Sequence, residues 1–218
     1  MNFNLDPAYV TIQDQAQACA REIEPIAVEA DKMSEVHPGV LDALRKSGLC
    51  SLMVPRRYGG TFENPDPLAI CLVREVLMGT SAHADSLFAL QGIGSYGITV
   101  AGTQKQCERW LPSIAAADDL AALALTELET GSDLKALKTT VTPEGNCLRL
   151  TGEKSFISNA GVAALYLVLA REKEGHSLLL VPGNSPGITI TPTPEIIAPH
   201  VLGEIRFDNV ELAANARL

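Results

Sequence analysis

The chain has 218 residues and a net charge of −9 at pH 7; 46% of its residues are hydrophobic and 20% are charged. This length allows one large or two modest domains, each with its own core, and the composition is typical of a folded soluble protein. The acidic balance argues against a general nucleic-acid binder, because neutralising phosphates requires Lys and Arg.

The first residues, MNFNLDPAYV, lack the basic segment and apolar core of a secretory signal. We therefore expect a cytoplasmic protein. Residues 86–104 carry no charge, but they contain four glycines together with Ser, Thr and Gln. They are interpreted as a buried helix of a soluble bundle, and no membrane insertion is expected.

The first half of the chain has the periodicity of helices. Apolar residues recur at helical spacings, with loops rich in Pro and Gly between the periodic segments. The helices are expected within residues 6–32, 37–48, 67–80, 81–102 and 103–119.

Local signals mark several helix ends. Gly48 should end the second helix, Pro67 suits the first turn of the third, and Thr103 suits an N-cap. Because proline lacks an N–H, Pro25 should kink the first helix or mark an entry into a new turn, and Pro112 should break or bend the far end of the last.

From about residue 120 the pattern changes to short strands separated by turn sequences such as PEGN and GNSPG. The strand-length segments are 120–126, 136–142, 147–159, 164–172, 176–182, 187–192 and 204–210. The sequence therefore predicts an α+β protein of two domains. An N-terminal all-helical domain (1–119) is followed by a small antiparallel β-barrel or sandwich domain (120–218).

Several common kinds of site find no support. The five cysteines are widely spaced without a C-x-x-C pair, so neither a disulfide framework nor a zinc site is expected. None of the four histidines lies in an H-E-x-x-H frame, so no metal site is predicted. Ser132 is not in a G-x-S-x-G elbow. The stretch GIGSYG, residues 92–97, lacks the preceding strand of a dinucleotide fingerprint, so its glycines are interpreted as close helix packing.

The stretch ALTELETGSDLKAL, residues 124–137, is the first candidate for a binding site. An apolar run ends at Thr126 and gives way to acids, a glycine and a serine. Thr126 and Ser132 supply hydroxyls that can donate hydrogen bonds, and Gly131 permits close approach of a ligand to the backbone. A strand followed by a solvated polar turn would also explain this pattern.

The stretch GEKSFISNAG, residues 152–161, is the second candidate. Phe156 and Ser158 are two residues apart on a predicted strand, so their side chains should share a face. An aromatic plane beside a hydroxyl donor suits a flat heteroaromatic ligand such as a flavin ring. A core aromatic beside a surface serine is the alternative.

Together the two stretches resemble the acyl-CoA dehydrogenase family. LTELETGSDLKAL is similar to the family's L-T-E-x-x-x-G-S-D signature, with Leu128 where a proline is usual. LTGEKSFISNAGVAALYLVLAR resembles its N-G-x-K-x-[WF]-I-[ST]-N-x-G strand pair, and MVPRRYGG resembles its P-x-x-Y-G-G loop. Residues 187–212 resemble the stretch that leads out of its β domain. The resemblance spans essentially the whole chain in order and agrees with the helical-then-β organisation.

The resemblance implies an enzyme that dehydrogenates an acyl-CoA substrate at its α,β bond, with FAD as cofactor and hydride transfer to flavin N5. It places Thr126 near the pyrimidine edge of the flavin, Ser132 at the acyl-CoA side, and Ser158 as a donor toward N5. The cofactor-binding residues that it implies are Leu123, Leu125, Thr126, Gly131, Ser132, Phe156, Ile157 and Ser158.

Members of the family also have a C-terminal helical bundle that carries the catalytic glutamate, and this chain stops before it. The resemblance thus implies a fragment, or one part of a split enzyme, that is inactive alone and contains no catalytic residue. It further implies fatty acid metabolism, an electron-transfer flavoprotein or similar acceptor, and a homo-oligomer or a heteromer with a C-terminal-domain partner. An acyl-CoA oxidase or flavin monooxygenase of the same fold, and a non-catalytic binding module, remain alternatives. The acyl chain and the electron acceptor stay open.

Overall fold

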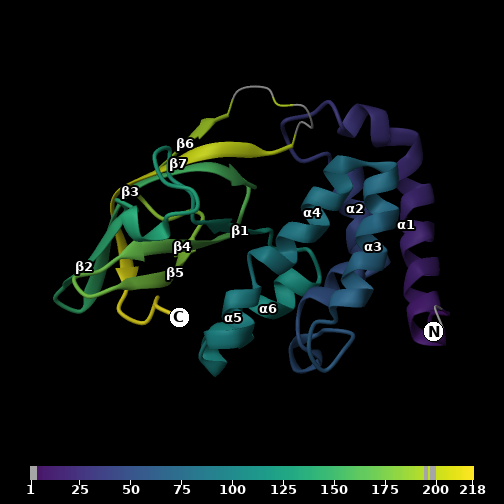
Figure 1. Cartoon of the computed structure of the whole chain (residues 1–218), viewed down its shortest axis with the longest axis horizontal. Helices are drawn as coiled ribbons and strands as arrows, with labels where there is room; N and C mark the ends of the chain where they lie inside the picture. The colour runs from purple at the N-terminus through teal and green to yellow at the C-terminus, as the bar shows by residue number, and fades with distance from the viewer. Residues whose placement is uncertain (1–3, 194–195, 197–199) are drawn as a thin grey trace.

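The chain folds into a helical half and a β half that lie side by side (Figure 1). The computed structural model describes residues 4–193, 196 and 200–218, so the stretch 187–212 lies partly outside the described residues. The described helices are α1 (Pro7–Ala30), α2 (Pro38–Ser47), α3 (Pro67–Thr80), α4 (Ala82–Ile93), α5 (Tyr96–Ala101) and α6 (Gln104–Ala115). The described strands are β1 (Ala121–Ala124), β2 (Thr140–Glu144), β3 (Cys147–Ser158), β4 (Leu165–Arg171), β5 (His176–Pro182), β6 (Ile188–Pro192) and β7 (Leu202–Ala213). A helical domain followed by a β domain is confirmed, and the exact boundary at residue 119 stays a prediction.

Three helix ends lie where the local signals predict them. Pro67 occupies the first turn of α3. Thr103 caps α6 and forms a capping box with Gln106. Gly48, with φ of 67°, ends α2 in the left-handed conformation.

The two internal prolines do not end their helices. Helix α1 continues past Pro25 to Ala30, and α6 continues past Pro112 to Ala115, so neither helix is broken at its proline. A kink at Pro25 and a bend at Pro112 stay predictions. Each proline removes one helical hydrogen bond. Buried side chains near it, such as Ile23 in α1, hold the helix by tertiary packing.

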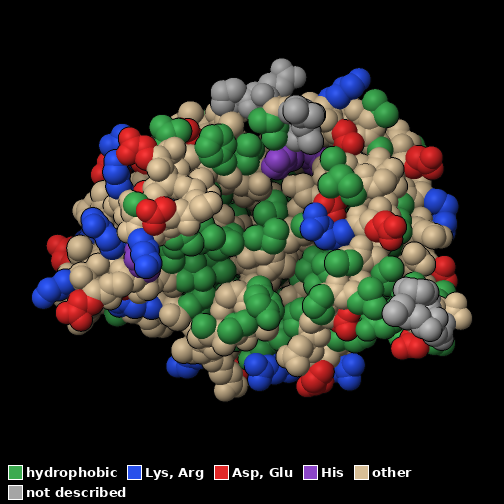
Figure 2. Space-filling model, viewed as in Figure 1, with side chains coloured by type: hydrophobic (Ala, Val, Ile, Leu, Met, Phe, Trp, Pro, Cys, Tyr) green, Lys and Arg blue, Asp and Glu red, His purple; other side chains and the backbone are tan. Residues whose placement is uncertain are grey.

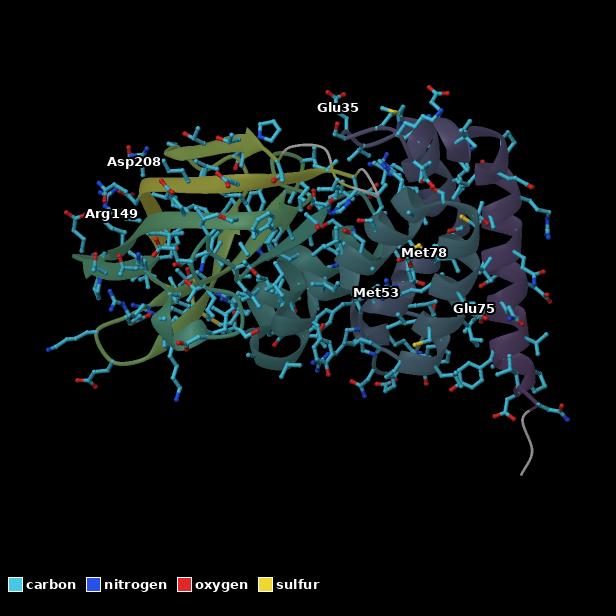
Figure 3. The ribbon with its side chains drawn as sticks, turned by 45° about the horizontal axis from the view of Figure 1, so that its top comes forward. Glu35, Met53, Glu75, Met78, Arg149 and Asp208 are labelled. Atoms are coloured by element: carbon cyan, nitrogen blue, oxygen red, sulfur yellow. The ribbon has the colours of Figure 1, made fainter. Side chains whose placement is uncertain are left out.

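The apolar stretch 81–102 forms two helices, α4 and α5, rather than the single helix expected. The chain turns at Gly94, where an added Cβ would lie 2.6 Å from the Cβ of Ala121 in β1. A Cβ on Gly92 would lie 2.6 Å from the sulfur of Met53, which Figure 3 labels among the helices. The interpretation of these glycines as close packing is therefore confirmed, and one of them lets α4 approach the sheet.

The described strands form one curled seven-stranded sheet in the order β1-β4-β2-β3-β7-β6, with β5 paired to β4. Most neighbours are antiparallel, as predicted, but β1 and β2 each run parallel to β4. The pairing of β3 with β7 contains two register shifts. One of them lies between Lys154 and Ile157, inside the second candidate stretch.

Strand β1 forms the wall between the two halves. Ala121 packs in the hydrophobic cluster of the helices, together with Leu165 and Leu167 of β4. Ala122 and Ala124 face the other way and pack in the cluster inside the β half. This alternation follows from the strand's period of two, and it places the end of β1 beside both halves.

Candidate functional site

The structure brings the two candidate stretches together. The backbone N–H of Ser155 donates to the carbonyl of Thr126 at 2.9 Å. The loop after β1 therefore lies against the last third of β3, although the two stretches are far apart in the sequence. This contact makes a shared site geometrically feasible.

A buried ion pair fixes the junction from behind. The completely buried Lys154 donates from Nζ to the carbonyl of Leu125 at 2.8 Å and to Oε1 of Glu127 at 3.0 Å. The Glu127 carboxylate also accepts from the backbone N–H groups of Lys138, at 2.6 Å, and Thr139, at 2.9 Å. These bonds tie the loop after β1 to β3 and to the residues that lead into β2.

Electrostatics hold the Glu127 carboxylate in its ionised form. Burial opposes ionisation, but hydrogen bonds from Lys138, Thr139 and Lys154 outweigh it and lower the pKa of Glu127 to about 2. Burial also lowers the pKa of Lys154, and the Glu127 carboxylate opposes that shift. Because an unpaired charge is costly in such a place, each partner depends on the other.

The residues after Glu127 form a tight turn that leads into solvent. Glu127 and Thr130 exchange backbone hydrogen bonds of 2.9 and 3.0 Å, and Leu128 is exposed at the tip. Gly131 and Ser132 follow and are both exposed. A Cβ on Gly131 would meet no atom within 4 Å. The described atoms of this chain therefore do not require glycine at this position, and the space beside it is open.

A β-bulge shapes the second stretch. Between Lys154 and Ile157, β3 has one residue more than β7. Phe156 adopts φ of 58°, which is uncommon for an aromatic residue. The bulge turns Ile157 into the β core and leaves Phe156 56% exposed. The simple alternation that predicted a shared face for Phe156 and Ser158 is interrupted at this point.

The predicted cofactor residues fall into two groups. Leu123 packs against the helical cluster and Ile157 packs inside the β cluster, so their side chains serve the two cores. Leu125 is half-buried and its carbonyl is occupied by Lys154. The side chains left accessible are those of Thr126, Ser132, Phe156 and Ser158. Among the described residues, the Thr126 and Ser132 hydroxyls have no hydrogen-bond partner.

A groove extends from Ser158 between the β half and helices α3 and α4. Ser158 and His200 line one side, and the cavity volume is about 260 Å³. The α4 side presents Ala82, Ser86, Ala89 and Ile93, and α3 contributes Met78, which is labelled on the helical half in Figure 3. Figure 2 shows hydrophobic side chains gathered across the middle of the viewed face, between the two halves.

One charged pair lies in this groove. Arg74 of α3 donates from Nε and Nη2 to the carboxylate of Asp85 in α4, at 2.9 and 2.7 Å. Asp85 is buried, and the two-pronged pairing satisfies both of its oxygens. The groove is therefore apolar along most of α4, with one neutralised ion pair in its wall.

A second hollow lies beside the loop after β1. Its volume is about 400 Å³, and Leu128, Lys138, Ser155 and Arg206 are among its lining residues. The loop after β1 thus forms part of the wall of this hollow.

Sequence reasoning missed the residues that hold the site in place. Glu127 was interpreted only as part of an acidic turn, and Lys154 was assigned no role. One signal was available: Lys154 has the same strand parity as Leu148 and Leu150, both of which are buried. An inward-facing lysine implies a buried carboxylate partner.

Two buried amides were also missed. Gln91 of α4 donates to the carbonyls of Ile114, at 3.0 Å, and Asp119, at 2.9 Å, and accepts from the N–H of Ala121 at 3.1 Å. Asn159 donates to the carbonyl of Ala121 at 3.0 Å. Both backbone groups of Ala121 are therefore held by side chains from other elements, which fixes β1 relative to α4 and to the end of β3.

In the part of the chain that the structure describes, no three His, Cys, Asp or Glu residues are placed to hold a metal ion. None of the described helices has the length and apolar character needed to cross a membrane.

Two protein-family models match consecutive parts of the chain. The model of the acyl-CoA dehydrogenase N-terminal domain matches residues 8–118. The model of the acyl-CoA dehydrogenase middle domain matches residues 122–210. The chain belongs to the acyl-CoA dehydrogenase family.

Curated members of the acyl-CoA dehydrogenase family are similar over most of this chain. The cyclohexane-1-carbonyl-CoA dehydrogenase of Geobacter metallireducens is 32% identical over 193 residues, which cover 86% of this chain and 50% of that protein. An acyl-CoA dehydrogenase of Bacillus subtilis is 30% identical over 200 residues, which cover 88% of this chain and 52% of that protein. The chain spans about half the length of these curated relatives.

Solved structures of acyl-CoA dehydrogenases share the fold. A glutaryl-CoA dehydrogenase from Mycobacterium smegmatis, in complex with FADH2, aligns with a TM-score of 0.89 at 25% identity and covers 98% of this chain and 55% of that chain. A chain from the structural study of the electron transferring flavoprotein of Acidaminococcus fermentans aligns with a TM-score of 0.93 at 26% identity. That alignment covers 100% of this chain and 59% of the other chain.

Proposed function

We propose that this chain forms the N-terminal and middle parts of an FAD-dependent acyl-CoA dehydrogenase. The observation that supports the proposal most strongly is the junction of the two candidate stretches. The Lys154–Glu127 pair fixes that junction from inside, while Thr126, Phe156 and Ser158 remain accessible. Dehydrogenases of CoA thioesters among its relatives, and the FADH2 complex of one structural neighbour, support the choice of substrate and cofactor.

The accessible residues fit a flavin ring. An aromatic side chain that is 56% exposed at a bulge offers a flat apolar surface, which a soluble protein would otherwise bury. Thr126 and Ser132 have hydroxyls without partners among the described residues, so they are free to donate to polar groups of a ligand. The apolar groove beside Ser158 suits an acyl chain.

Bound FAD would accept the β-hydrogen of the thioester as a hydride. The residues of this chain would then bind and orient the reactants. Thr126 would donate toward the pyrimidine edge of the ring, Ser158 toward N5, and Phe156 would lie against the ring. Such hydrogen bonds stabilise the negative charge that develops on reduction. Leu125, Gly131 and the backbone of Ile157 would complete the cradle, and the groove would exclude water from the acyl group.

No residue of this chain is assigned as the catalytic base. The proposal includes an electron-transfer flavoprotein or similar acceptor, which the match to a chain from the Acidaminococcus study supports. It also includes a homo-oligomer or a heteromer with a C-terminal-domain partner, a role in fatty acid metabolism and a cytoplasmic location.

A flavin titration tests the proposal. We would measure the quenching of FAD fluorescence by the purified chain, and expect weak but saturable binding. Thr126→Ala and Ser158→Ala should each weaken it about five-fold, the effect of one hydrogen bond. Thr142→Ala, an exposed threonine on β2, is the matched control and should bind as the native chain does. Absence of binding, or equal binding by all variants, would contradict the proposal.

A further inference from the structure

The Ser158 hydroxyl has a hydrogen-bond partner beside the groove. Its Oγ lies 3.1 Å from Nε2 of His200, a residue that precedes β7. A serine hydroxyl carries a single proton to donate, whereas its oxygen can accept from two groups. The direction of the Ser158–His200 hydrogen bond therefore decides whether that proton is available to a ligand.

The proton on His200 Nε2 determines this direction. When Nε2 carries a proton, it donates to the Ser158 oxygen, and the Ser158 O–H can point into the groove. When Nε2 carries no proton, it accepts the Ser158 proton, and the hydroxyl has nothing left to donate. A charged imidazole always donates from Nε2 to the Ser158 oxygen, because both of its nitrogens carry protons.

Several charged or titratable groups lie near His200. Within the described residues, the groove that it lines also contains Arg74 and Asp85, which neutralise each other. His83, in the first turn of α4, interacts with His200 electrostatically. Burial lowers the pKa of His83, with Asp31 opposing and His37 and His200 reinforcing the shift.

His83 is held in its neutral form by its own contacts. Its Nε2 accepts a hydrogen bond of 3.1 Å from the backbone N–H of His37, which requires that nitrogen to be unprotonated. His83 therefore adds no charge of its own beside His200.

We propose that His200 is a positioning residue that sets the direction of the Ser158 hydroxyl and so switches its donation into the groove. The identity of the acceptor as a flavin rests on the proposed function, but the Ser158–His200 interaction does not. Lower pH should favour donation by Ser158 into the groove, and higher pH should favour donation to His200.

A measurement without flavin tests the interaction itself. We would record the 15N chemical shifts of the histidine rings of the purified chain from about pH 5.5 to about pH 8.5, the range in which histidine changes charge. In Ser158→Ala, the titration curve of His200 should shift, while that of the exposed His176 should not. Identical His200 curves with and without the serine hydroxyl would overturn the proposal.

A measurement with flavin tests the consequence. For the native chain, we expect FAD affinity to fall by about five-fold from the acid to the alkaline end, the effect of one hydrogen bond. His200→Phe and His200→Gln should both lose this pH dependence, and Gln covers the case in which Phe disturbs folding. His176→Gln should keep it.

The two measurements separate the possible failures. If the native chain binds no FAD, the proposed function fails, and the 15N titration alone judges the Ser158–His200 interaction. If FAD binds and its affinity in His200→Gln follows pH as in the native chain, the inference about His200 is wrong although the proposed function stands.

Discussion

The loop after β1 contains two lysine–glutamate pairs in opposite environments. The inner pair, Lys154 and Glu127, has side chains that are 0% and 8% exposed. The outer pair, Lys138 and Glu129, has side chains that are 73% and 71% exposed. The two glutamates are separated by one residue, yet one supports the junction of two strands and the other lies in solvent. A single motif thus combines a structural side with a solvent-facing side, on which the proposal places the ligand, and charge alone does not show which residue lies on which side.

Removal of the inner lysine gives the largest expected effect. Lys154→Met should lower the free energy of unfolding by about 3 to 5 kcal/mol, because it leaves the buried Glu127 carboxylate without its partner. Urea denaturation measures the loss. Lys138→Ala, which removes only the outer pair, is the matched control and should leave the free energy of unfolding nearly unchanged, because water screens this pair. Similar losses in the two variants would show that the inner pair has no special structural role.

Acid should weaken the inner pair over a defined range. The pKa of Glu127 is about 2 in the folded chain and about 4.3 in an unfolded chain. A lowered folded-state pKa means that the stabilisation is present above the unfolded pKa and is lost as pH falls through the folded pKa. The difference between these two pKa values of Glu127 corresponds to about 3 kcal/mol of folding stability.

The pH dependence can be assigned to one residue by substitution. Urea denaturation between about pH 7 and pH 2 should show a steep loss of stability for the native chain and a flatter one for Glu127→Gln. Glu129→Gln should follow the native curve closely, because its carboxylate lies in solvent. A steep loss that persists in Glu127→Gln would assign the acid sensitivity to other groups.

The sequence predicts features that depend on neighbouring residues. Gly48, Pro67 and Thr103 mark helix ends through local backbone geometry, and each lies where it was expected. The change from helical to strand periodicity near residue 120 likewise identifies the two halves. These are short-range signals, so no knowledge of the tertiary structure is needed to interpret them.

Features that depend on distant contacts were missed. Lys154 and Glu127 are 27 residues apart, and no local pattern shows that they meet. The bulge at Phe156 depends on how β3 pairs with β7. One extra residue in β3 shifts that pairing, but it leaves no mark in the apolar pattern of the sequence. Helix α1 continues past Pro25 because packing outweighs the lost hydrogen bond. The approximate location of the site was therefore predictable, but the residues that support it were not.

Asn159 belongs to the second candidate stretch, but like Lys154 its side chain is buried and supports the fold. Its amide donates to Ala121, and its φ is 62°, where Asn and Gly are tolerated. Asn159→Ala should cost about 2 kcal/mol, since it combines a lost buried hydrogen bond with a strained backbone. Asn159→Gly should cost about 1 kcal/mol less than Ala, because it removes only the hydrogen bond. Equal costs in thermal denaturation would show that backbone strain contributes nothing.

Phe156 gives the smallest expected change in stability and the clearest test of the solvent-facing side. Its left-handed φ is strained and its ring is 56% exposed, so little packing is lost on removal. Phe156→Gly should leave the free energy of unfolding within about 1 kcal/mol of native, because relief of strain offsets the greater freedom of the unfolded chain. The same substitution should weaken FAD binding in the fluorescence titration, because the ring surface is gone.

The control for Phe156 is an aromatic residue of the core on the neighbouring strand. Phe207 of β7 is 1% exposed, and Phe207→Ala should cost about 3 to 5 kcal/mol. If Phe156→Gly were destabilised as strongly, the ring would be a structural element rather than a surface kept for a ligand. If its stability and its FAD affinity were both unchanged, the strained backbone at the bulge would have no function in flavin binding. If Phe156 serves the ligand rather than the fold, Phe156→Gly should remain stable and bind flavin more weakly.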